Sequence, residues 1–219
     1  MSFILDLLYP RRCYGCGRTG SYFCPQCSSK LIYQSVKPHY PAGFDGTLSL
    51  FHYDGPIKSA IGDLKFNFVS DLVSELSTLM VSALQSQYSH LLTYWQQSGF
   101  TLIPIPLHPS RARWRGFNQS ELLCQELSSK LKIPCNPDIL IRSKNTQPQA
   151  QIKNKSYRSV NVNSSFALSD FSPSCQRGGR GRLNKVILVD DVATTGSTLS
   201  SALSVFPKST EAWALTIAG

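Results

Sequence analysis

The chain has 219 residues, of which 22 are Lys or Arg and 13 are Asp or Glu, so its formal net charge at pH 7 is +9. Hydrophobic residues make up 42% of a sequence without internal repeats or low-complexity tracts, which excludes a repeat array and favours one α/β domain plus a small module. The positive charge suits a polyanionic ligand, nucleic acid or simply solubility, and residues 111–158 contain ten basic and three acidic residues.

The amino-terminal apolar run, residues 3–8, is interrupted by Asp6. It is too short to cross a bilayer or to form the core of a signal peptide. We therefore expect no membrane insertion and a cytoplasmic protein. The run itself predicts a short amphipathic helix that packs on its own domain.

Two Cys-x-x-Cys pairs follow, separated by seven residues: Cys13, Cys16, Cys24 and Cys27. This spacing predicts four thiolates around one Zn²⁺, and four sulfur ligands close the coordination sphere, so the metal would be structural. Two disulfides are the weaker alternative in a reducing compartment. The remaining cysteines lie in unrelated contexts and are expected to be ordinary, partly buried side chains: Cys124, Cys135 and Cys175.

Residues 30–44 are rich in Pro, Tyr and Lys and predict a connector. An alternating strand is expected over residues 47–53, a helix over 55–64 and a second helix, with one apolar side that covers a sheet, over 71–84. Lys65 follows the first of these helices, and a single lysine is usually a solvated side chain.

Residues 100–106 predict a strand, the first of the core sheet, and residues 120–131 a helix. Between them lies a basic loop in which Arg111, Arg113 and Arg115 alternate around Trp114. Such a cluster is costly unless an anion lies among the guanidinium groups. An exposed basic turn and a nucleic-acid patch remain as alternatives.

Residues 186–189 are four consecutive aliphatic residues, which predict a strand buried on both faces of a parallel sheet. Asp190 and Asp191 end this strand, a hydroxyl-rich turn follows, and residues 198–206 have helical spacing. A last strand is expected over residues 211–217. The turn therefore lies at the carboxyl end of a strand, where open α/β sheets bind ligands.

The composition of this turn favours a phosphate group, because its backbone N–H groups and hydroxyls are suitable donors and Gly196 permits close approach. The acidic pair would repel a phosphate but can accept hydrogen bonds from vicinal hydroxyls, so a ribose 5-phosphate satisfies both. Aspartates that merely cap the helix are the simplest alternative. A P-loop NTPase would need a G-x-x-x-x-G-K-[ST] segment, which the sequence lacks. The candidate binding residues are Asp190, Asp191, Ala193, Thr194, Thr195, Gly196, Ser197 and Thr198.

The pattern hhhhDDxxTTGxT resembles the phosphoribosyl pyrophosphate (PRPP) motif of type I phosphoribosyltransferases. This resemblance implies that Asp190 and Asp191 hold the 2- and 3-hydroxyls of the ribose and that residues 193–198 hold the 5-phosphate. With P-x-P-x-H-P-x-R-x-R-x-R-G-F-N-Q, an upstream Leu64-Lys65-Phe66 and the four-cysteine finger, the chain is similar to the ComF family of amidophosphoribosyltransferase-like proteins. Some of that family are associated with competence for DNA uptake.

The family resemblance implies a type I phosphoribosyltransferase fold of about five core strands, residues 41–219, preceded by a zinc-finger module, residues 1–40. It also implies a mobile hood that contains Gln149 and Arg158, although one residue is inserted between Ile152 and Arg158 relative to the family pattern. A polar loop without a binding role has the same composition.

As an enzyme, the protein would bind PRPP with Mg²⁺ and transfer the phosphoribosyl group to a nitrogen nucleophile, a glycosyltransferase reaction of the pentosyl class. The leaving pyrophosphate would be stabilised by basic candidates: Lys65, Arg111, Arg113 and Arg115. Purine-salvage relatives carry another acid at the position of Thr194, so the hydroxyl there disfavours purine salvage. The chain also does not begin with the Cys nucleophile of a glutaminase domain, which disfavours glutamine-dependent amination on this chain alone.

Two alternatives are not enzymes. In the first, a PRPP-sensing accessory factor contacts single-stranded DNA or a helicase partner. In the second, the chain is a zinc-dependent nucleic-acid binder without a PRPP site.

Overall fold

The structure, a computed structural model, describes residues 10–66, 69, 71–142, 165–169 and 184–219. The amino-terminal helix expected over residues 3–8 and the expected hood residues Gln149 and Arg158 lie outside these ranges.

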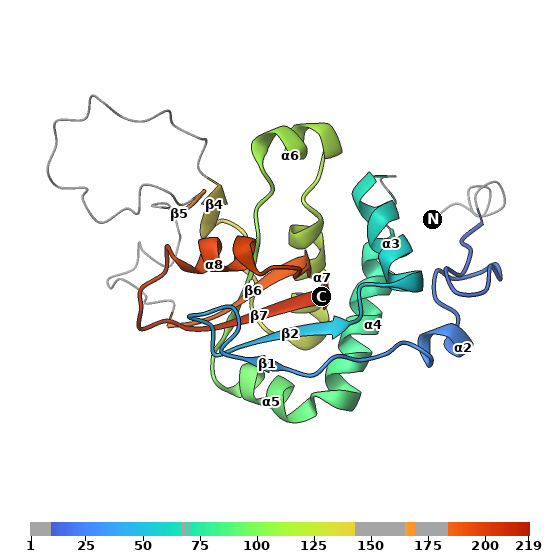
Figure 1. Ribbon diagram of the computed structural model, residues 1–219, viewed down its shortest axis with the longest axis horizontal. Helices are drawn as coiled ribbons and strands as arrows, with labels where there is room; N and C mark the ends of the chain where they lie inside the picture. The colour runs from blue at the N-terminus through green and yellow to red at the C-terminus, as the bar shows by residue number, and fades with distance from the viewer. Residues whose placement is uncertain (1–9, 67–68, 70, 143–164, 170–183) are drawn as a thin grey trace, which may run out of the picture.

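Within the described residues, a five-stranded sheet has the order β1-β2-β7-β6-β3 (Figure 1). The strands are β1 (Lys37–Pro38), β2 (Gly46–Phe51), β3 (Thr101–Pro104), β6 (Lys185–Val192) and β7 (Glu211–Ala218). β1 pairs antiparallel with β2, and every other pairing in this sheet is parallel. The mixed α/β class with a parallel sheet is therefore confirmed.

β6 is an interior strand, between β7 and β3, and its apolar run packs on both faces of the sheet. Ile187 and Val189 join the core on one side, whereas Val186 and Leu188 join the core on the other. The first side is covered by α3 (Gly55–Phe66), α4 (Leu72–Gln87), α5 (Ser89–Gln97) and α7 (Gln119–Leu131). The second is covered by α8 (Ser197–Leu203) and by a small sheet of β4 (Leu140–Arg142) and β5 (Phe166–Leu168).

The strand predicted over residues 47–53 forms as β2, and all six of its residues are buried. β3 forms where a strand is predicted, but it is not the first core strand, because β1 and β2 precede it and β7 pairs with β2. Within the described residues it is an edge strand.

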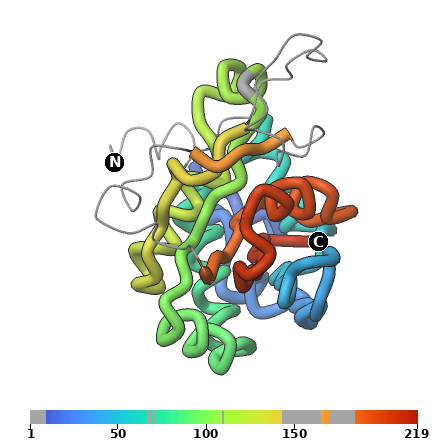
Figure 2. The backbone as a smooth tube through the Cα atoms, turned by 90° about the vertical axis from the view of Figure 1, so that its left-hand side faces the viewer, coloured from blue at the N-terminus to red at the C-terminus, as the bar shows by residue number. Residues whose placement is uncertain are grey.

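The basic segment after β3 is a helix rather than a loop: α6 (Pro109–Arg115). His108 caps it by accepting a hydrogen bond from the N–H of Ser110, Pro109 occupies the first turn, and Gly116 ends it in the left-handed conformation with φ +76°. Both views show α6 projecting from the body of the molecule (Figures 1 and 2).

The four-cysteine finger, which includes α2 (Pro25–Ser28), packs on α3 and α4. The Tyr14 hydroxyl donates to Asp63 over 2.6 Å, and the Tyr22 amide donates to Glu75 over 3.1 Å. Phe23 is buried in the same core as these helices. The domain boundary after residue 40 stays a prediction. In the described part of the chain, no helix combines the length and apolar character needed to cross a membrane.

Candidate functional site

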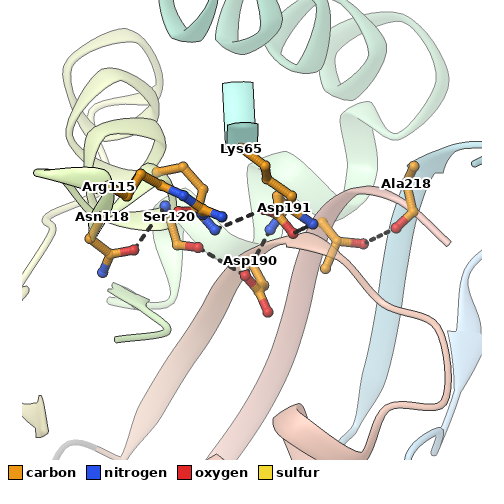
Figure 3. A network of polar contacts seen from close by, with 9 residues as sticks. Lys65, Arg115, Asn118, Ser120, Asp190, Asp191 and Ala218 are labelled. Carbon is orange, nitrogen blue, oxygen red and sulfur yellow. Dashed lines mark hydrogen bonds and ion pairs between the residues drawn. The ribbon is translucent and has the colours of Figure 1, made fainter. Parts of the chain in front are cut away.

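Asp190 and Asp191 lie near the carboxyl end of β6 and contact residues from two other parts of the chain (Figure 3). Asp191 is 4% exposed, and both of its oxygens are engaged: Oδ1 lies 2.8 Å from Lys65 Nζ, and Oδ2 accepts a 2.9 Å hydrogen bond from Gln119 Nε2. Lys65 is therefore paired with a buried carboxylate and is not an ordinary solvated lysine.

Asp190 has a different environment. Its Oδ1 accepts hydrogen bonds from the Ser120 hydroxyl at 2.8 Å and from the Asp191 amide at 2.9 Å. Its Oδ2 forms no hydrogen bond with any residue that the structure describes. A ligand hydroxyl or a cation would therefore find an open acceptor on Asp190 and an occupied one on Asp191.

The start of α7 brings both polar partners to the acidic pair. Asn118 caps this helix by accepting from the Ser120 amide at 3.2 Å, and its side-chain N–H group donates to the Ile105 carbonyl just after β3. Arg115 donates to Gln119 Oε1 at 2.6 Å, which orients the Gln119 amide toward Asp191. The sequence predicts the helix over residues 120–131 but not its Asn118 cap. The contacts of Gln119 with Asp191 and of Ser120 with Asp190 span 72 and 70 residues and have no local signal.

Burial and the neighbouring charge of Asp191 raise the pKa of Asp190 to about 7. The opposing effects are hydrogen bonds to its carboxylate and the charge of Lys65. Near neutral pH this carboxyl therefore changes charge readily, and any bound cation or hydroxyl donor shifts it toward the ionised form.

The three arginines of the basic segment lie on two different faces, because the segment is a helix. Arg111 and Arg115 are four residues apart and share one face, whereas Arg113 lies on another. Arg115 is 6% exposed and Arg113 is exposed. Burial lowers the pKa of Arg115; the charge of Asp191 opposes this shift and the charge of Arg111 adds to it.

Arg142, on β4, is a basic residue that the sequence did not single out. Its guanidinium lies 4.9 Å from the Phe166 ring centroid, and burial, with the charge of Arg111, lowers its pKa while the charge of Asp190 raises it. The Nε atoms of Arg142 and Arg115 are buried without a hydrogen-bond partner in the described residues. Such donors are expected to have a partner when a site is filled.

Arg142 also lines an open hollow of about 520 Å³, whose other lining residues are Pro106, Leu107, Pro137, Asp138, Leu140, Ile141 and Ser169. Neither member of the acidic pair lines this hollow. The charge of Asp190 nevertheless raises the pKa of Arg142, against the larger effect of burial.

In the turn after the acidic pair, some backbone amides donate hydrogen bonds within the protein and others do not. The Ala193 amide donates to the Ala218 carbonyl at 2.9 Å, so it is not available to a ligand. The Ser197 amide lies 3.4 Å from the Thr195 hydroxyl. Four other predicted donors form no hydrogen bond with the described residues: the amides of Thr194, Thr195, Gly196 and Thr198.

Both the backbone conformation at position 196 and the closeness of Pro41 require glycine there. Its φ is +69°, and a Cβ atom there would lie 2.4 Å from Pro41 Cγ. Tyr40, beside Pro41, donates a 3.2 Å hydrogen bond to the Thr195 carbonyl. The segment between β1 and β2 therefore supports the turn, which sequence spacing did not indicate.

Two exposed aromatic rings lie beside this site. Phe66 is 59% exposed and Trp114 is 57% exposed, with their centroids 6.3 Å apart. The guanidinium of Arg115 lies 5.9 Å from the Phe66 centroid. The chain neighbours of both rings, Lys65 and Arg115, belong to the polar network around Asp191.

The predicted zinc ligands come together: the sulfur atoms of Cys13, Cys16, Cys24 and Cys27 all lie within 4.8 Å of one another. Tetrahedral Zn–S bonds of about 2.3 Å place sulfurs about 3.8 Å apart, and the Cys16 and Cys24 sulfurs are separated by 3.7 Å. The four sulfurs therefore fit a closed structural Zn²⁺ site.

The surroundings of these cysteines favour metal binding. Burial alone would raise the pKa of Cys13, but N–H groups from both knuckles donate to its sulfur and lower the pKa to about 6. Gly15 is required here, because a Cβ atom would lie 2.7 Å from the Cys27 sulfur.

Comparison with known proteins gives matches to both parts of the chain. The double zinc ribbon domain family matches residues 4–39. DNA utilization protein YhgH of Escherichia coli is 30% identical over 196 residues, 86% of this chain and 79% of that protein. Competence protein F of Haemophilus influenzae is 30% identical over 203 residues, 90% and 84% of the two chains. Competence protein ComFC of Bacillus subtilis is 28% identical over 154 residues, 70% and 55% respectively.

Proposed function

Since this chain belongs to the ComF family, that of competence protein F and DNA utilization protein YhgH, we propose that it binds PRPP with Mg²⁺ and transfers the phosphoribosyl group to a nitrogen nucleophile. The single observation that carries the proposal is the pairing of an acidic strand end with a turn of open amides. Donors and acceptors of this kind, one after the other at the carboxyl end of a parallel strand, suit a sugar phosphate.

We assign the type I phosphoribosyltransferase fold on the same grounds. Support comes from the parallel sheet with helices on both faces and from β4 and β5, which flank the chain segment expected to form the hood. Gln149 and Arg158 would act from that segment.

The ribose hydroxyls would bind first to Asp190, because its Oδ2 is open. Asp191 is neutralised by Lys65 and oriented by Gln119. It would bind the second hydroxyl with an oxygen that also accepts from one of these two side chains. The 5-phosphate would accept hydrogen bonds from the amides of residues 194–196 and 198, and from the hydroxyls of the same turn. The Ala193 amide has no part in this contact.

The pyrophosphate would lie on the side of Arg111, Arg115 and Arg142, two of which have buried Nε donors without partners. Mg²⁺ prefers oxygen ligands, which Asp190 and the PRPP oxygens provide, and when bound it neutralises charge on the leaving group. Lys65 would act chiefly by holding Asp191 ionised. As pyrophosphate leaves, the three arginines would stabilise its charge while the nitrogen nucleophile attacks the anomeric carbon.

Isothermal titration of the zinc-loaded chain with PRPP and Mg²⁺ tests the proposal. We expect saturable binding that Asp190→Asn weakens strongly. Arg111→Ala should weaken it roughly tenfold, about the value of one charge-assisted contact. Arg113→Ala is the matched control, an exposed arginine on another face of the same helix, and should have little effect.

Release of pyrophosphate with an added amine or heterocycle would then establish turnover. The proposal fails if PRPP with Mg²⁺ does not bind the zinc-loaded wild type. It also fails if Arg111→Ala and Arg113→Ala have equal effects.

A second candidate function is that of an accessory factor that binds PRPP without turnover and contacts single-stranded DNA or a helicase partner. The exposed Phe66 and Trp114 rings favour it, since base stacking on aromatic side chains beside arginines is how single strands bind without sequence preference. Among the relatives of this chain, YhgH is named a DNA utilization protein, and the proteins of Haemophilus influenzae and Bacillus subtilis are named competence proteins.

Fluorescence anisotropy of a labelled oligothymidine at several salt concentrations tests the second candidate. Phe66→Ala with Trp114→Ala should weaken binding about tenfold or more. Tyr33→Ala removes another exposed aromatic ring and should not. Equal weakening by both changes, or DNA binding unaffected by the double change, would exclude this surface as the DNA contact.

A further inference from the structure

Cys124 and Cys135 are in contact, although the sequence places them in unrelated contexts. Their sulfur atoms are 3.0 Å apart. α7 ends at Leu131, Lys132 takes the left-handed conformation with φ +58°, and the chain returns along the side of the helix. That reversal, which the spacing of the two cysteines does not reveal, brings them together.

The backbone on each side of this pair is fixed. Cys124 is fully buried in α7, one turn after Ser120. Cys135 lies beside β3, where Leu102 donates to the Pro134 carbonyl at 2.8 Å and accepts from the Asn136 amide at 3.0 Å. A disulfide with an S–S bond of about 2.05 Å needs the sulfurs to approach by only about 1 Å.

We propose that Cys124 and Cys135 form a redox-modifiable dithiol, which a small-molecule disulfide such as oxidised glutathione converts reversibly into an intramolecular disulfide. Cys135 is the attacking thiol, because it is only partly buried whereas Cys124 is fully buried. The hydrogen bond between the two sulfurs also lowers the pKa of Cys135, while burial raises that of Cys124.

The exchange has two steps. The Cys135 thiolate attacks one sulfur of the oxidant and releases one thiolate, leaving a mixed disulfide on Cys135. Cys124 then loses its proton and attacks the Cys135 sulfur, which releases the second thiol. The protein loses two hydrogens, and one disulfide molecule becomes two thiols.

The new bond would tie α7 to the chain segment beside β3. This cross-link lies one helical turn from Ser120, which contacts Asp190. It involves none of the four zinc cysteines and does not depend on PRPP binding.

The test uses the zinc-loaded full chain, equilibrated at several ratios of oxidised to reduced glutathione, alkylated, digested and analysed by mass spectrometry. We expect a linked peptide pair containing Cys124 and Cys135, two hydrogens lighter than its reduced form and restored by dithiothreitol, with the zinc content unchanged. The urea midpoint of the oxidised chain should rise.

Cys124→Ser distinguishes this exchange from simple surface oxidation. Without the second thiol, Cys135 should retain a glutathione adduct that the wild type resolves. The proposal is overturned if both cysteines stay free throughout the series, if either links to Cys175, or if wild type and Cys124→Ser carry the same adduct on Cys135. The wild-type peptide result decides the matter even if the variant folds poorly.

Discussion

Replacing Asp190 by Asn should remove a pH-dependent loss of stability. Burial and the charge of Asp191 raise the pKa of Asp190 from 3.8 to about 7. A carboxyl with a raised pKa binds its proton more tightly in the folded chain than in the unfolded chain. The free energy of unfolding therefore falls as pH rises from about 4 to about 7 and levels off above that.

The expected difference in the free energy of unfolding follows from the change in the pKa of Asp190. Each tenfold change in proton affinity corresponds to about 1.4 kcal/mol, so ionising Asp190 costs the folded chain on the order of 4 kcal/mol. Asn keeps the Oδ1 acceptor for Ser120 and the Asp191 amide without the charge. At pH 8 the free energy of unfolding of Asp190→Asn should exceed that of the wild type by an amount of this order.

Urea unfolding at intervals from pH 5 to pH 8, followed by circular dichroism, measures the effect. The difference between wild type and variant is the useful quantity, because zinc-linked pH effects are common to both. We expect the variant's advantage to grow as pH rises toward 7. A difference that is constant over this range, or that moves in favour of the wild type, would refute the electrostatic reasoning.

Three further outcomes follow from the structure. Lys65→Met should lower the free energy of unfolding, measured with urea, by on the order of 2 kcal/mol, because it leaves the buried Asp191 carboxylate without its cation. Lys58→Met, at an exposed position on the same helix, should leave the free energy of unfolding unchanged. Gly196→Ala should lower the free energy of unfolding by roughly 1–3 kcal/mol, because the new Cβ atom clashes with Pro41 and the backbone has positive φ. Gly62→Ala, where a Cβ atom on the helix meets open space, should leave this free energy unchanged or raise it. Thermal unfolding of the two variants distinguishes these outcomes. Removing Zn²⁺ with a chelator should lower the melting temperature and the near-ultraviolet circular dichroism of the packed finger, and both should return when zinc is restored.

Much of the architecture follows from local sequence patterns. The apolar run ending at Asp190 predicts a strand buried on both faces, and it forms within β6. The paired cysteines likewise place their sulfurs around one point. In both cases the signal is short in range and repeated over neighbouring residues, so tertiary packing does not override it.

The contacts of the site could not be predicted in the same way. Lys65 reaches Asp191 only because α3 packs against the sheet, and no feature of its own position in the sequence indicates this pairing. α6 is an intermediate case: Pro109 and Gly116 are ordinary start and stop signals for a helix, but the alternating arginines favoured a loop. Recognising that helix would have separated Arg113 from the other two arginines.

The tryptophans differ sharply in their surroundings. Trp95 is fully buried and Trp213 half-buried, while Trp114 is 57% exposed on the projecting helix, beside Phe66 and the polar network of Asp191. Emission quenched by a water-soluble agent such as iodide therefore comes chiefly from Trp114. The molecule carries a natural optical label at the rim of its candidate site, with which arrival of a ligand can be timed without attaching a dye.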